Sequence, residues 1–204
     1  MCGIFGCVGE KDVSSVIIKG LKRLEYRGYD SAGLCLETDD SNFEILKSSN
    51  SNYPVDVLSK SLEKSKISSN AGIGHTRWAT HGPINNINTH PHFSYSKNIS
   101  IVHNGIVENY DFLSKFLIRK GVNIHSQTDS ELIAHLVDLM LCSKGNLQSA
   151  IFSVSNMLEG SNTVALMSKE IPQTIFGFTT NSSGGLVVGE KNNYRFLSSD
   201  SYAL

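Results

Sequence analysis

The sequence contains 204 residues, with 18 basic and 19 acidic side chains and a formal net charge of -1. This length fits one domain with a substantial core, and the balanced charge, without a basic run, excludes the usual signatures of nucleic-acid and membrane-surface binding. No apolar run approaches the ~18–20 residues of a membrane span, and the N-terminus lacks a signal-peptide pattern. We therefore expect one domain, residues 1–204, that acts on a small molecule.

The cysteines indicate the redox environment. Cys2, Cys7, Cys35 and Cys142 include no CxxC pair and are too few for a disulfide framework in a chain of this length. We expect reduced thiols and a cytoplasmic location.

The first third of the chain predicts three strands and two helices. Asp12 is placed to cap a helix whose apolar side chains recur at helical spacing, and Gly28 and Gly33 mark a turn before the second strand. The predicted strands are 3–9, 33–37 and 43–47, and the predicted helices are 13–24 and 54–66.

The middle of the chain predicts two strands, 71–76 and 99–105, with a long irregular stretch, 77–98, between them. A loop of that length inside a compact domain is typically either functional or disordered. Asn104 and Gly105 end the second strand with a turn signal.

Three helices are predicted next. Asn109 is placed to cap a helix that stops before Gly121. Thr128 and Glu131 have the spacing of a capping box, and an apolar helical face follows them. A third helix covers about 146–158.

After Gly160 the sequence changes to short β-rich segments without a repeat period. Strands at both ends of the chain, with paired helices between them, predict an α+β fold of sheets covered by helices. The last segments are TVALM (163–167), TIFGF (174–178), GLVVG (185–189) and YRFLS (194–198).

Cys2 directly follows the initiator methionine, and a small residue at position 2 is the usual condition for removing Met1. Cys2 would then carry a thiol and a free α-amine on one residue. An α-amine titrates near ~7.7–8.0 and a thiol near ~8.5, so the amine is a suitable base for the thiol. Gly3 would leave room for a substrate beside the new terminus. The alternative is that Cys2 is an early residue of a buried strand.

Six stretches identify a family. They are CGIFG (2–6), GLKRLEYRGYDSAG (20–33), HTRWATHG (75–82), HPH (90–92), VHNGIVEN (102–109) and TDSELIAHL (128–136). In this order they resemble the glutaminase domains of glucosamine-6-phosphate synthases, within the N-terminal-nucleophile (class II) glutamine amidotransferases. The resemblance covers essentially the whole chain. It implies the N-terminal nucleophile hydrolase fold, a four-layer αββα sandwich of two mostly antiparallel sheets.

The resemblance implies a chemistry for L-glutamine. Cys2 would attack the side-chain amide to form a γ-glutamyl thioester, and its own amine would move the proton, through a water. The side-chain amide of Asn104 and the backbone N–H of Gly105 would form the oxyanion hole. Taken alone, Asn-Gly equally predicts an ordinary hairpin turn.

Substrate binding is implied for two charged residues and for a loop. Arg77 would hold the carboxylate and Asp129 the α-ammonium, although an acid in the first turn of a helix also stabilises the helix by itself. Trp78, Thr80 and His81 would belong to a mobile loop that closes over glutamine. For Trp78 the alternative is an ordinary place in the core.

Arg27, Gly28 and Asp30 are expected to form the turn that packs against Cys2, with a positioning role. His90 and His92, with His81, raise the alternative of a metal site. We disfavour it because no acidic or thiol partner has metal-site spacing. We expect neither a metal nor a cofactor.

Family glutaminase domains continue beyond this chain into a sugar-phosphate isomerase half. With that half, ammonia would convert fructose 6-phosphate to glucosamine 6-phosphate, in an enzyme that forms a homodimer at full length. We therefore expect a fragment or a split gene product, truncated at its C-terminal end. The stretch NSSGGL (181–186) departs from the family pattern Arg-x-Gly-Ser-Pro-Leu.

Two other functions stay open. The chain could be a catalytically silent regulatory or interaction fragment of the same fold. It could also be a stand-alone hydrolase for another amide, which the pair Arg77 and Asp129 disfavours because the pair suits a free amino acid.

Overall fold

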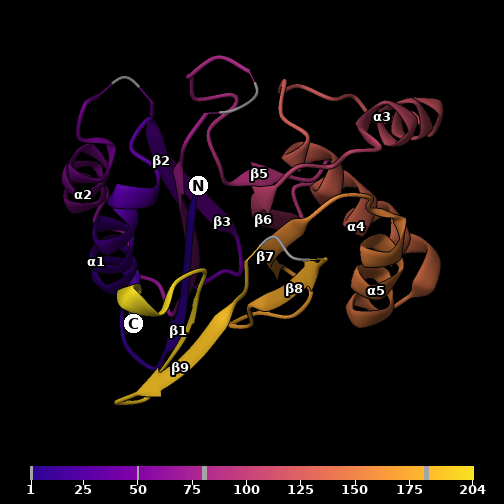
Figure 1. Cartoon of the computed structure of the whole chain (residues 1–204). Helices are drawn as coiled ribbons and strands as arrows, with labels where there is room; N and C mark the ends of the chain where they lie inside the picture. Colours follow the sequence, from indigo (N-terminus) through magenta and orange to yellow (C-terminus); the bar gives the residue numbers. More distant parts are fainter. Residues whose placement is uncertain (1, 50, 80–81, 182–183) are drawn as a thin grey trace.

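The computed structural model describes residues 2–49, 51–79, 82–181 and 184–204. Two sheets lie face to face between two groups of helices (Figure 1). The six-stranded sheet has the order β3-β2-β4-β1-β10-β9 and the four-stranded sheet the order β5-β6-β7-β8. Every strand pair is antiparallel.

The larger sheet uses both ends of the chain. Its strands are β1 (Gly3–Gly9), β2 (Ser31–Glu37), β3 (Phe43–Ser48), β4 (Ala71–Arg77), β9 (Val187–Lys191) and β10 (Tyr194–Ser198). Strand β1 lies in the interior of this sheet, between β4 and β10, so the N-terminal residues are held from both sides. Helices α1 (Ser14–Leu24) and α2 (Pro54–Ser65) cover its outer face.

The smaller sheet contains β5 (His92–Phe93), β6 (Ile99–Gly105), β7 (Asn162–Ser168) and β8 (Phe176–Thr180). Its outer face is covered by α3 (Tyr110–Arg119), α4 (Ser130–Lys144) and α5 (Leu147–Met157). Two short 3-10 turns complete the elements, η1 (Glu25–Arg27) and η2 (Ser201–Ala203).

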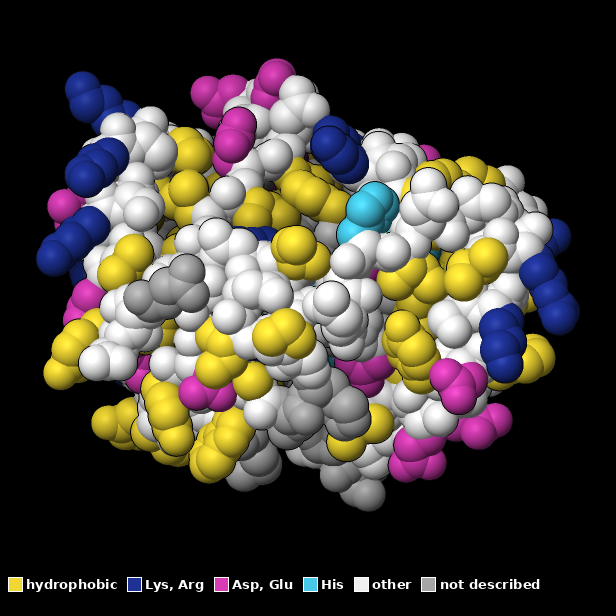
Figure 2. All heavy atoms as spheres, turned by 90° about the horizontal axis from the view of Figure 1, so that it is seen from above, with side chains coloured by type: hydrophobic (Ala, Val, Ile, Leu, Met, Phe, Trp, Pro, Cys, Tyr) yellow, Lys and Arg dark blue, Asp and Glu magenta, His cyan; other side chains and the backbone are white. Residues whose placement is uncertain are grey.

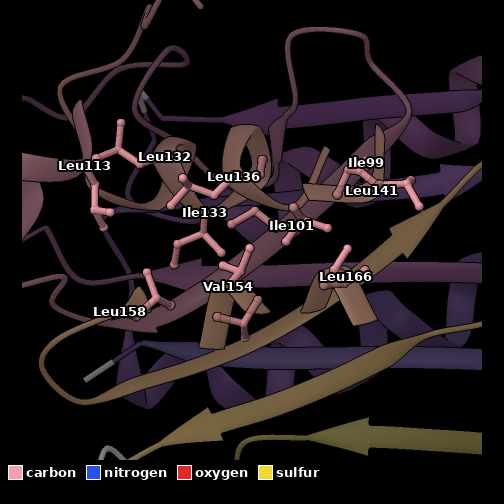
Figure 3. Close-up of a cluster of buried hydrophobic side chains, with 14 of the residues drawn as sticks. Ile99, Ile101, Leu113, Leu132, Ile133, Leu136, Leu141, Val154, Leu158 and Leu166 are labelled. Atoms are coloured by element: carbon pink, nitrogen blue, oxygen red, sulfur yellow. The ribbon is translucent and has the colours of Figure 1, made fainter. Parts of the chain in front are cut away.

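Three hydrophobic clusters hold these layers together. One lies under α1 and α2, and a second fills the space between the smaller sheet and its helices, where Ile101, Ile133 and Leu136 meet (Figure 3). The third lies between the sheets and includes Ile4 of β1 and Ile73 of β4. Burying each such side chain contributes about 1.5–3 kcal/mol. The alternation along β1 places Ile4 in the cluster between the sheets and Phe5 and Cys7 in the cluster under the helices. The predicted αββα fold is confirmed.

Several local predictions need correction. Gly33 lies inside β2 rather than in a turn, because its missing Cβ admits the backbone oxygen of His90, only 2.1 Å from where that Cβ would stand. The irregular stretch 77–98 contains the short strand β5. Asn104 and Gly105 are the last residues of β6, and Gly105 pairs with Asn162 of β7, so the hairpin reading is wrong.

The prediction of a capping box at Thr128 and Glu131 is also wrong. Helix α4 begins at Ser130, and its N-cap residue, Asp129, makes no side-chain capping bond. The Glu131 carboxylate instead accepts hydrogen bonds from the backbone N–H groups of His125 and Ser126. Asn109 does stand at the N-cap of α3, but its side-chain amide donates to Met157 O.

Charged side chains lie mainly around the rim of the face shown in Figure 2, with hydrophobic side chains scattered across its centre. Within the described residues, no helix combines the length and the apolar character needed to cross a bilayer.

Candidate active site

Cys2 directly precedes the first residue of β1 and lies beside the last residues of β4. Because Gly3 pairs with Thr76 in an antiparallel register, the residue before Gly3 meets the residues after Thr76. The Cys2 Sγ accepts a hydrogen bond from the Trp78 N–H at 3.2 Å. The space beside Gly3 is taken, since a Cβ there would lie 2.6 Å from Thr76 Oγ1 and 2.7 Å from Leu24 Cβ. The missing Cβ of Gly3 therefore serves the packing of β1 against β4 and α1.

The Cys2 thiol differs from the buried thiols of the core. Burial raises the pKa of Cys2, and the Trp78 N–H and the charge of Arg77 offset only part of that effect. Burial raises the pKa of Cys7 and Cys35 further, to about 12, so both are inert packing residues. A Cys2 nucleophile consequently requires a base.

A small recess of about 40 Å³ lies next to Cys2. Five of the residues assigned to catalysis or substrate binding from the sequence line it: Cys2, Arg77, Trp78, Gly105 and Asp129. His90, which the sequence raised only as a metal alternative, lines it too. The five residues come from the ends of β1, β4 and β6 and from the N-terminus of α4, so four elements distant in sequence converge here. The volume suffices for only a few water molecules.

Gly105 lines the recess from the end of β6, and Asn104 before it contacts Cys2. The Asn104 Nδ2 donates to Cys2 O at 3.0 Å, and its Oδ1 lies 3.0 Å from His75 Nε2. Gly105 has φ +143, and a Cβ there would lie 2.2 Å from Ser161 O. Only glycine fits this position, which brings the backbone close to the recess.

Arg77 and Asp129 supply opposite charges at the recess. Arg77 ends β4 and is 4% exposed, and burial lowers its pKa while the neighbouring Cys2 and Asp129 raise it. Asp129 Oδ2 accepts the Val107 N–H at 2.8 Å, which ties α4 to the segment after β6. A free amino acid carries the complementary pair of charges.

The turn after η1 packs against the end of β4. Asp30 Oδ2 accepts the Ala79 N–H at 2.8 Å, and the Asp30 N–H donates to Arg77 O at 3.1 Å. A Cβ at Gly28 would lie 2.7 Å from the backbone carbon of Arg77. The Arg27 guanidinium contacts the C-terminal segment, where its Nη1 lies 2.8 Å from Asp200 Oδ2.

Trp78 is 45% exposed and packs against Tyr29, with ring centroids 5.7 Å apart, so the core-tryptophan alternative is wrong. Thr80 and His81 lie outside the described residues. The His90 ring is buried and lies 4.7 Å from the ring of His92. Across the described parts of the chain, no group of three His, Cys, Asp or Glu side chains could hold a metal ion.

Sequence reasoning assigned no site role to three other residues that line the recess, His103, Thr128 and Ser130. The His103 Nδ1 lies 2.9 Å from Ser130 Oγ, which joins β6 to α4. Their position inside the stretches VHNG and TDSE was the available signal.

Comparisons with known proteins agree with this geometry. The sequence profile described as "Glutamine amidotransferase domain" matches residues 75–204. The glutamine–fructose-6-phosphate aminotransferase (isomerizing) of Caldanaerobacter subterraneus is 40% identical over 200 residues, 98% of this chain and 32% of that protein. The protein of the same name from Tropheryma whipplei is 42% identical over 202 residues, with the same two coverages. The chain thus spans about a third of the length of these curated relatives.

Two solved structures have the same fold. Glutamine phosphoribosylpyrophosphate amidotransferase from B. subtilis superposes with a TM-score of 0.82 at 24% identity, over 99% of this chain and 42% of that one. An allosteric regulatory enzyme of purine biosynthesis superposes with a TM-score of 0.84 at 26% identity, with the same coverages. The profile match and the identity to the aminotransferases show that this chain belongs to the family of glutamine amidotransferase domains, as its six sequence stretches predicted.

Proposed function

We propose that this domain hydrolyses L-glutamine to glutamate and ammonia through a thioester on Cys2. The observation that carries the proposal is a recess lined by the Cys2 thiol and a pair of opposite charges, with the Asn104 side-chain amide hydrogen-bonded to Cys2 O beside it. A nucleophile, an oxyanion donor and two charged anchors are the groups that glutamine hydrolysis needs.

The first step is attack on the substrate. Once Met1 is removed, the α-amine of Cys2 takes the thiol proton, directly or through a water, and the sulfur bonds to the side-chain amide carbon of glutamine. The carbon–nitrogen bond then breaks, and the amine returns the proton to the leaving group, which departs as ammonia. Because burial raises the pKa of the Cys2 thiol, this base is essential to the rate.

The second step is hydrolysis of the thioester. A water attacks the γ-glutamyl carbon, its proton passes to the Cys2 thiolate through the same amine, and glutamate leaves. Both steps place negative charge on the former amide oxygen. We assign its stabilisation to the Asn104 amide and the Gly105 N–H, each of which is typically worth about 10²–10³ in rate.

Arg77 and Asp129 would hold the α-carboxylate and the α-ammonium of glutamine. The recess beside Cys2 is small, about 40 Å³, and we propose that a neighbouring segment closes over glutamine when it binds there. We assign this closing to the segment of the exposed Trp78, and positioning of Trp78 to Asp30 and its turn. Thr80 and His81 are proposed to bind glutamine together with Trp78.

We further propose that residues 1–204 are one glutaminase domain of a longer enzyme. Its relatives carry the name glutamine–fructose-6-phosphate aminotransferase, which favours fructose 6-phosphate as the final ammonia acceptor. A homodimer at full length is part of the same proposal. All four cysteines are free thiols, which favours a reducing, cytoplasmic location.

The test is glutamate release by the purified chain, with intact mass measured to establish removal of Met1. Cys2→Ala should abolish release, and Cys2→Ser should leave a small residual rate because the hydroxyl is a weaker nucleophile. Asn52→Ala, at an exposed position, is the matched control. Equal rates for wild type and Cys2→Ala would refute the proposal, and so would full activity of a preparation that retains Met1. An electrophilic glutamine analogue that labels Cys2 would argue against a silent domain.

A further inference from the structure

A buried histidine outside the recess controls the orientation of Asn104. His75 belongs to β4, is 0% exposed and points between the two sheets, toward β6. Its Nε2 lies 3.0 Å from Asn104 Oδ1 and 3.1 Å from His103 O. It does not line the recess, so any effect on chemistry passes through its neighbours, and among them Asn104 is the one whose side chain donates to Cys2.

The two acceptors determine which ring nitrogen carries hydrogen. A backbone carbonyl oxygen can only accept, so the contact with His103 O requires a hydrogen on Nε2. Among the described residues, Nδ1 has no hydrogen-bond partner. Burial lowers the pKa of His75 to about 3, so the ring is neutral and its single N–H is the one on Nε2.

That N–H in turn determines the orientation of Asn104. Oxygen and nitrogen of an asparagine amide are distinguished by their partners, and the donor His75 Nε2–H requires the oxygen on its side. The amide NH₂ is thereby turned toward Cys2 and donates to Cys2 O at 3.0 Å. Because one N–H is shared between the Asn104 side chain and the carbonyl of the preceding residue, both the rotamer and the backbone of Asn104 are restrained.

The His75 ring is itself held in place. The His90 ring packs against it with centroids 4.1 Å apart, and His90 is brought there by the close approach of its backbone to Gly33 of β2. The ring therefore has little freedom to rotate away from β6.

We propose that His75 is a positioning residue for the oxyanion hole, whose shared Nε2–H keeps the Asn104 amide NH₂ on the side of Cys2. The inference depends on the proposed glutaminase function for its kinetic consequence. Its structural part is a neutral His75 ring whose Nε2–H is shared by two oxygens, and this part does not depend on the proposed function.

The kinetic test compares His75→Leu, which removes the donor, with His75→Gln, whose amide can place an N–H near the original Nε2. We expect His75→Leu to lower kcat for glutamine about 10–100-fold with KM changed less than about threefold, and His75→Gln to recover most of the loss. His135→Gln, at another buried histidine, is the matched control and should leave kcat unchanged.

A double-variant cycle separates positioning from general packing. In an Asn104→Ala background, His75→Leu should cost less than about threefold further, because the group it orients is already gone. A wild-type kcat for His75→Leu would overturn the inference. The same fold-loss in both backgrounds would also overturn it, because that result describes a structural residue.

Nitrogen-15 NMR of the wild-type chain keeps the inference testable if the leucine variant fails to fold. His75 should show a protonated Nε2 and an unprotonated Nδ1 that persist from about pH 8 to about pH 5. A protonated Nδ1 in that range would refute the inference. If wild type releases no glutamate, the proposed function fails, and this spectrum alone decides whether His75 orients Asn104.

Discussion

The strands beside the recess and the strands near the C-terminus are covered very differently. Every residue of β4 and β7 is buried, and β6 is buried as far as Asn104. Strand β9 has no buried residue, and β8 alternates between half-buried and exposed positions. A strand covered on both faces holds its polar side chains through specific hydrogen bonds, because no water is available to replace them.

This difference explains where the site can be built. His75, His103 and Asn104 are buried polar groups that restrain one another across two sheets. The edge strands β8 and β9 provide no comparable surroundings, and they lie at the ends of their sheets. Changes in the buried strands should therefore affect chemistry and stability strongly, and changes in the edge strands should affect both weakly.

The largest effect is expected at the donor to the oxyanion. Asn104→Ala should lower kcat for glutamine about 10²–10³-fold, since one preorganised hydrogen bond to developing charge is lost. Steady-state glutamate release measures this, with circular dichroism to check that the fold is intact. A decrease in kcat of less than about threefold would show that the buried Asn104 at the end of β6 is not a catalytic donor.

A core deletion tests the same comparison through stability. Leu136→Ala, in the fully buried cluster under α4, should lower the free energy of unfolding by about 2–5 kcal/mol. Val188→Ala, on the edge strand β9 with a 72% exposed side chain, should change it by less than about 0.5 kcal/mol. Urea unfolding of both variants measures the contrast, and similar losses would remove the distinction between the two regions.

Mild acid should lower the stability of the fold through its buried histidines. Burial lowers the pKa of His75 from 6.5 to about 3, so below pH 6.5 the unfolded chain binds a proton that folded His75 does not. The free energy of unfolding should therefore fall between about pH 6.5 and pH 5, by about 1 kcal/mol per pH unit on average for this one group. The lowered pKa values of His90 and His92 act in the same direction.

Urea unfolding at several pH values in that interval tests this slope. His75→Gln should reduce it, and His125→Gln, at an exposed side chain, should not. The interval lies above the range in which Glu131 contributes: its pKa is lowered because hydrogen bonds from His135 and Ser126 outweigh the effect of burial. Equal slopes in wild type and His75→Gln would contradict the prediction.

The smallest effect is expected where the C-terminal segment meets η1. Asp200→Asn weakens the ion pair with Arg27, which is partly exposed, and should cost about 0.5–1 kcal/mol of stability. The rate at which a glutamine analogue labels Cys2 should stay within about twofold of wild type. A large change in that rate would show that Arg27 positions the nucleophile from this turn.

Much of the architecture followed from local pattern. Period-2 and period-3.6 apolar spacing predicted most of the strands and helices, and glycine or proline marked many of the ends. The family resemblance predicted Cys2, Arg77, Gly105 and Asp129 as site residues, and the fold brings them to one recess. These predictions needed only the order of residues along the chain, either as local periodicity or as whole motifs.

Other features depended on contacts that local pattern cannot specify. The capping-box spacing predicted the wrong partner for Glu131. Its carboxylate accepts hydrogen bonds from the backbone N–H groups of His125 and Ser126, in the segment before the helix. Strand β5 is two residues long, too short for any periodicity to show.

The bond between His75 and Asn104 joins residues 29 positions apart on different sheets. Its existence depends on strand register, on which face each side chain occupies and on how closely the two sheets pack. Those quantities are set when the layers come together, because buried polar groups must find partners in whatever geometry the apolar packing allows.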